Sequence, residues 1–64
     1  MRTKLIKLRG TATRQEISKE LGITPQMLGA IERGGRNPSL KLAQKIAIYY
    51  NVPIEDIFFD NLET

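Results

Sequence analysis

The chain contains no cysteine and no histidine among its 64 residues. It therefore has no disulfide and no thiolate metal site to support a small core. It also lacks the side chains that most often bind zinc or act as a general base near neutral pH. Carboxylates alone could form an active site, but no pair of them stands apart from ordinary helix surface. We expect no enzyme activity, no metal and no cofactor.

Long apolar runs are missing as well. No stretch approaches the ~20 residues that a membrane-spanning helix needs, and no signal peptide is visible. We therefore expect a cytoplasmic protein with no membrane partner. The length predicts one domain over residues 1–64, near the lower limit for folding alone. Its core is expected at about 4–59, with a frayed tail at 60–64.

Charge is distributed unevenly along the chain. All ten Lys and Arg lie within residues 1–45, where three Glu reduce the net charge to +7. Residues 46–64 contain four acidic residues and no basic one, which gives −4. A basic body with an acidic end suits binding of a polyanion by the first part. A solvated surface with chance asymmetry is the alternative.

Caps, helix breakers and apolar spacing predict an all-α fold, a compact five-helix bundle without strands. Thr13 and Glu16 form a capping box, Ser39 is a candidate N-cap, and Asn51 can end a helix in the left-handed conformation. Apolar residues at i, i+3, i+4 and i+7 predict the inward stripe of the fourth helix. That stripe comprises Leu40, Ala43, Ile46, Ala47 and Tyr50. The expected helices cover about residues 3–9, 14–21, 25–33, 40–50 and 53–59.

The second and third of these helices are separated by a turn of only a few residues. Gly22 suits a position that requires a positive φ, Thr24 can cap the next helix, and Pro25 suits its first position. Two short amphipathic helices joined in this way predict a helix-turn-helix, which places its second helix in a DNA major groove. An ordinary helical hairpin is the alternative. The core of the motif is expected to comprise Ile17, Ser18, Leu21, Gly22, Ile23, Leu28 and Ile31.

Further segments make the pattern more specific. Residues 31–34 read Ile-Glu-Arg-Gly, residues 36–39 read Arg-Asn-Pro-Ser, and residues 52–58 read Val-Pro-Ile-Glu-Asp-Ile-Phe. With residues 13–17 and 21–24, and Gln26, they make the chain resemble the Xre/Cro/C1-type helix-turn-helix regulators, which include the lambdoid phage repressors. The resemblance covers about residues 4–59. It implies a five-helix bundle, sequence-specific binding of duplex DNA and a two-fold dimer on a pseudo-palindrome.

The chain departs from the usual pattern of that family at a few positions. Arg14 stands where the family usually has a Gln that contacts phosphate, and Arg retains a donor for that role. Pro25 stands where Arg or Gln often reads a base. Met27, Gly29 and Ala30 replace residues that are usually polar or basic. The connection before the second helix is also about two residues shorter than the family's usual one.

The third predicted helix carries the candidate base-reading residues. Leu28 and Ile31 are expected to point inward, and the residues expected to project outward are Gln26, Met27, Ala30 and Arg33. Gln26 can pair bidentately with adenine, while Met27 and Ala30 can contact thymine methyl groups. The candidate base-reading set is Gln26, Met27, Ala30 and Pro25.

Candidate phosphate contacts flank this helix. Arg14 lies in the first turn of the second helix, where amide donors and the helix dipole favour an anion. The other candidate phosphate-binding residues lie around the loop that follows the third helix. Glu32 occupies a family position that suggests a structural bond, either to a loop amide or to Arg36. The candidate phosphate-binding set is Arg14, Arg33, Arg36, Asn37 and Lys41.

The function expected from these features is a sequence-specific DNA-binding transcriptional regulator that represses transcription as a homodimer. A protein-binding module is the alternative, such as an antitoxin or a phage regulator controlled by a partner protein. Apolar residues outside the inward stripe, or near the chain end, offer a surface for either role. The candidate surface comprises Leu42, Ile48, Tyr49 and Phe59, with Ile57 and Phe58 as further apolar residues.

Overall fold

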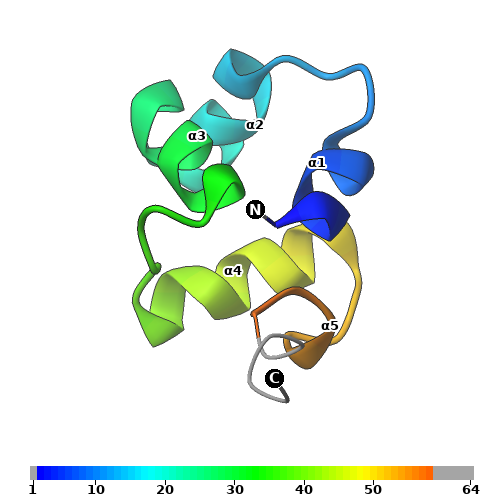
Figure 1. Cartoon of the computed structure of the whole chain (residues 1–64). Coiled ribbons are helices and arrows are strands. Elements are labelled where there is room, and N and C mark those ends of the chain that lie inside the picture. The colour runs from blue at the N-terminus through cyan, green and yellow to red at the C-terminus, as the bar shows by residue number, and fades with distance from the viewer. Residues whose placement is uncertain (1, 59–64) are drawn as a thin grey trace.

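Five α-helices follow one another in residues 2–58, the part of the chain that the computed structural model describes (Figure 1). Predictions about Phe59 and about fraying at 60–64 lie outside the described residues. No strand occurs within residues 2–58. The helices are α1 (Thr3–Arg9), α2 (Arg14–Leu21), α3 (Pro25–Arg33), α4 (Leu40–Tyr50) and α5 (Glu55–Phe58).

The predicted bounds of the first four helices are confirmed, and those of the fifth are wrong. α5 begins at Glu55 rather than at Pro53. The carbonyls of Pro53 and Ile54 accept bonds from the amides three residues later, at 3.1 Å each. The chain therefore makes a tight turn before it enters the helix.

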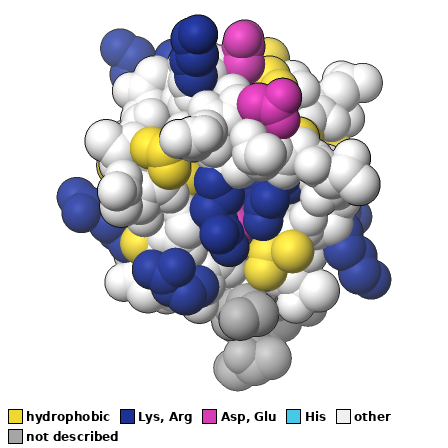
Figure 2. All heavy atoms as spheres, turned by 90° about the horizontal axis from the view of Figure 1, so that it is seen from above, with side chains coloured by type: hydrophobic (Ala, Val, Ile, Leu, Met, Phe, Trp, Pro, Cys, Tyr) yellow, Lys and Arg dark blue, Asp and Glu magenta, His cyan; other side chains and the backbone are white. Residues whose placement is uncertain are grey.

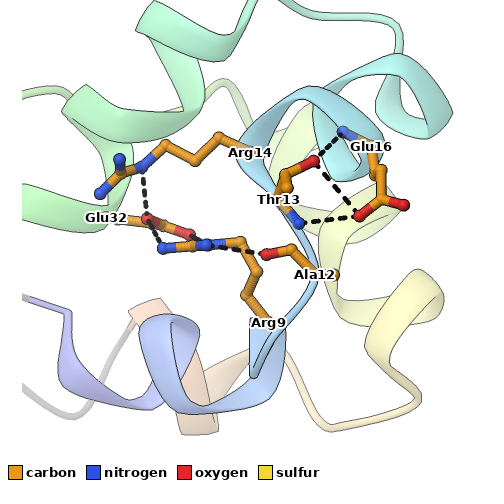
Figure 3. A network of polar contacts seen from close by, with 6 residues as sticks. All are labelled: Arg9, Ala12, Thr13, Arg14, Glu16 and Glu32. Atoms are coloured by element: carbon orange, nitrogen blue, oxygen red, sulfur yellow. Dashed lines mark hydrogen bonds and ion pairs between the residues drawn. The ribbon is translucent and has the colours of Figure 1, made fainter.

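The predicted caps form as expected. The amide of Glu16 donates to Thr13 Oγ1 at 3.1 Å, and the amide of Thr13 donates to Glu16 Oε1 at 2.8 Å, which completes the capping box (Figure 3). Thr24 Oγ1 accepts from the Met27 amide and thereby begins α3. Gly22 has φ of 74°, so the turn between α2 and α3 uses the left-handed conformation that glycine tolerates best.

The core lies where the helices converge. α2 packs against α3 and α4, while α1 packs against α3 and α5. Among the residues expected in the helix-turn-helix core, the apolar helix positions and Ser18 are buried, Ile23 in the turn packs against them, and Gly22 is exposed. The buried cluster comprises Leu5, Ile17, Leu21, Leu28, Ile31, Ile46, Ala47 and Ile57.

The predicted inward stripe of α4 is wrong at its first residue. Leu40 is 65% exposed, because α4 begins at the edge of the bundle and the buried part of the helix starts further along (Figure 1). Ala43, Ile46 and Ala47 are buried as expected. Leu42, expected outside the stripe, is instead half-buried and packs against the core. Within residues 2–58, no helix is long and apolar enough to cross a membrane.

Candidate nucleic-acid interface

The outer face of α3 presents the candidate base-reading residues. Gln26 is exposed in the first turn, directly after Pro25 at the first helical position. Ala30 is half-buried one turn further along. Met27 was expected to project outward, but it is half-buried and packs partly against the core. Gln26 is therefore the most accessible member of the set.

A shallow hollow lies beside this face, between the beginning of α2 and α3. Its volume is about 360 Å³, and Gly29 forms part of its wall. Gly29 is buried. A glycine inside a helix costs stability relative to alanine, and this was the available signal that the position has a special role. The hollow is lined by Arg14, Pro25, Gln26, Gly29 and Arg33.

Glu32 lies at the centre of an ion-pair network that joins three helices. Its carboxylate is fully buried and accepts from Arg9 Nε at 2.8 Å and from Arg14 Nε at 3.1 Å (Figure 3). Arg9 also donates to the Ala12 carbonyl at 2.9 Å. The expected partner, a loop amide or Arg36, is wrong. Helical side chains lean toward the start of their own helix, which carries Glu32 away from the loop that follows α3.

This network affects the titration of its neighbours. The hydrogen bond to Glu32 raises the pKa of Arg9 above its usual value, so Arg9 stays charged. Burial raises the pKa of Tyr50 to about 12, and the negative charge of Glu32 acts in the same direction. The Tyr50 hydroxyl is buried and has no hydrogen-bond partner within the described part of the chain.

Arg2 forms hydrogen bonds with the end of α3 and with the loop that follows it. Its guanidinium donates to the Ile31 carbonyl at 2.7 Å, to the Arg36 carbonyl at 3.1 Å and to Asn37 Oδ1 at 2.7 Å. The same group lies 5.2 Å from the centre of the Phe58 ring. Sequence reasoning missed this role, because the bonded partners lie about thirty residues away and no local pattern connects them.

The candidate phosphate-binding residues differ in how free their side chains are. Arg33, Arg36 and Lys41 are exposed, and none takes part in an ion pair with the residues that the structure describes. Arg14 is half-exposed and bonded to Glu32, while Asn37 already accepts from Arg2 through its oxygen. Seen from above, Lys and Arg side chains gather at the centre of one face and recur around its rim (Figure 2).

A separate apolar surface lies on α4 and the segment after it. Ile48 is 78% exposed and Tyr49 is 44% exposed, as expected for two of the candidate surface residues. Ile48 borders an open groove of about 720 Å³. Val52 and Ile54 line the same groove. The groove is thus a second surface, formed by other residues than the basic one.

Comparison with known proteins gives consistent matches. A family model described as helix-turn-helix matches residues 5–57. A protein of Archaeoglobus fulgidus is 44% identical over 66 residues, covering 98% of this chain and 93% of that protein. One from Methanocaldococcus jannaschii is 52% identical over 46 residues, covering 72% and 70%. One from Bacillus subtilis is 33% identical over 58 residues, covering 91% and 88%. Each carries the name of an uncharacterised HTH-type transcriptional regulator.

Proposed function

The chain belongs to the Cro/C1-type helix-turn-helix family of transcriptional regulators, and from this premise we propose that it represses transcription by placing α3 in the major groove of a specific duplex site. DNA-binding regulation is the property of the family, whereas repression and the reading by α3 are our proposals. The observation that carries them is the outer face of α3, where exposed Gln26 lies beside two arginine side chains.

Base reading is assigned to the first part of α3. An exposed glutamine there can donate to and accept from adenine at once, and the neighbouring Met27 and Ala30 can contact thymine methyl groups. Pro25 adds no donor, but it fixes where the helix starts. We therefore propose a half-site in which Gln26 reads an A·T pair.

Phosphate binding is assigned to the basic residues around α3. Such contacts fix the protein on the duplex and provide most of the affinity without choosing a sequence. The exposed side chains of Arg33, Arg36 and Lys41 are available for this role. Arg14 and Asn37 can contribute the donors that their bonds to Glu32 and Arg2 leave unused.

We infer repression because it requires the fewest contacts from the protein. A protein bound across a promoter blocks access by occupancy alone, whereas activation needs an additional contact with the transcription machinery. We therefore propose that the regulator acts by occupancy, as a cytoplasmic homodimer in which residues 1–64 of each subunit form the DNA-binding domain.

The test is selection of bound duplexes from a random library, followed by transcription in vitro. We expect a recurrent site to emerge, and a template with that site across its promoter to give fewer transcripts as protein is added. A template with the site scrambled is the control. Recovery of no recurrent site would contradict specific reading, and unchanged or increased transcription would contradict repression.

A further inference from the structure

Two arginine side chains from different helices converge over one glycine of α3. A Cβ built on Gly29 would lie 3.1 Å from Arg33 Nη1 and 3.6 Å from Arg14 Nε. The two guanidinium groups therefore share the space above Gly29, in the hollow beside α3. This space exists because residue 29 has no side chain.

The charges around the hollow are unbalanced. Within the described residues, Glu32 is the single carboxylate that bonds to Arg14, and it also bonds to Arg9. No ion pair within residues 2–58 includes Arg33. Three guanidinium groups with one carboxylate leave two positive charges, and like charges held close together repel each other. An anion in the hollow would offset this repulsion through charge-assisted hydrogen bonds.

Arg14 is already oriented for such an anion. Its Nε donates to Glu32 at 3.1 Å, while its terminal nitrogens point away from Glu32 (Figure 3). A side chain held in this way loses little conformational entropy when it binds. The planar guanidinium group also matches the geometry of phosphate oxygens better than an ammonium does.

We propose that Arg14 and Arg33 form one site that binds a single backbone phosphate of duplex DNA, with Gly29 as its floor. This proposal rests on the proposed function, because the ligand is a phosphate at the edge of the groove that α3 enters. It adds that the two arginines share one phosphate. It also gives Gly29 a role, since a side chain at this position would displace the end of Arg33 from the hollow.

The first experiment compares Arg14→Gln, Arg33→Gln and the double variant on a duplex of mixed sequence across a range of salt concentrations. Glutamine at residue 14 keeps a donor for Glu32. If one phosphate is shared, each single variant keeps nearly the wild-type salt slope, because one arginine still contacts the phosphate. The double variant lowers the slope by about one unit. Two separate phosphates would give about one unit for each single variant and about two for the double.

The second experiment uses Gly29→Ala. The added methyl group lies against the mobile end of Arg33, so the fold is retained, and alanine is the better helix former. We expect the melting temperature to stay the same or rise while duplex affinity falls several-fold. Lys4→Gln removes one charge beside Asp56 of α5 and is the control for net charge, with a smaller effect expected.

The results of these experiments distinguish a failure of the shared phosphate site from a failure of the proposed function. A wild-type protein that binds no duplex would overturn both. Normal binding with additive slopes, or with Gly29→Ala equal to wild type, would overturn only the shared site. A loss in Arg33→Gln that is confined to some sequences would identify Arg33 as a base reader and would also overturn it.

Discussion

We expect sequence reading by α3 to depend most on Gln26. It is exposed in the first turn, and the preceding proline offers no side-chain donor. We expect Gln26→Ala to weaken binding to the selected site by about 1–3 kcal/mol and binding to random duplex by much less. Fluorescence anisotropy with both duplexes measures the ratio. Gln15→Ala, from exposed α2 surface, should leave that ratio unchanged, and equal weakening by Gln26→Ala would make Gln26 a positioning residue.

Arg36 represents the residues that we propose to provide affinity without choosing a sequence. Its side chain is exposed, while its backbone carbonyl is held by Arg2, so the charge is presented from a fixed loop. Arg36→Ala should weaken binding to every duplex and lower the salt slope by about one unit. Titrations at several salt concentrations check this. An unchanged slope and affinity would remove Arg36 from the phosphate-binding set.

Tyr50 is a residue whose hydroxyl reduces stability. The buried hydroxyl has no partner within residues 2–58, so Tyr50→Phe should stabilise the fold by about 1 kcal/mol near neutral pH. The folded pKa of about 12 lies above the ordinary value of 10.0, so the fold favours the protonated form. The free energy of unfolding is therefore unaffected by this titration below pH 10 and falls as pH rises toward 12.

Urea unfolding of wild type and Tyr50→Phe between neutral pH and pH 12 tests both statements about Tyr50. The variant should lose less stability above pH 10 than the wild type does. Tyr49→Phe changes the same group at a partly exposed site and should behave like wild type. A Tyr50→Phe variant that is less stable at neutral pH would show that the hydroxyl is satisfied in solution.

At the scale of the helices, Glu32 connects α3 with α1 and with the beginning of α2. Removing one partner of a buried ion pair leaves the other charge uncompensated, which costs about 3 kcal/mol or more. We expect that loss for Glu32→Ala in urea unfolding, because Arg9 is only 15% exposed and would lose its counter-ion. Glu16→Ala also removes a bonded carboxylate, but from an exposed capping box, and should cost about 1 kcal/mol. Equal losses would mean that the network adds little stability.

The ends of α2 can be predicted from sequence, whereas the polar contacts between helices cannot. Thr13 with Glu16, and Gly22, act on their own helix ends within a few residues, so they predict where α2 starts and stops. The partners of Glu32 lie eighteen and twenty-three residues away and depend on how the helices pack. The hollow over Gly29 depends on packing in the same way, since it forms only when α2 meets α3.

At the scale of the molecule, the outer face of α3 and the beginning of α5 differ in charge. Arg14 and Arg33 lie beside the outer face of α3, whereas Glu55 and Asp56 begin α5, and Lys4 reaches Asp56 at 3.8 Å. An acidic helix is a poor surface for DNA. We propose that two subunits make contact through the end of α4 and the segment after it, where exposed Ile48 borders an open groove.

A single α3 covers only a few base pairs, so one copy of the chain would discriminate weakly among genomic sites. Two copies related by a two-fold axis double the contacts and require half-sites about one DNA turn apart, ~10 bp between centres. We expect the selected site to be an inverted repeat and its saturated complex to contain two chains, as measured by sedimentation. Ile48→Asp should weaken this complex while a single half-site still binds the variant as it binds wild type, because the substitution lies on α4 rather than α3. A saturated complex with one chain on an asymmetric site would reject the dimer.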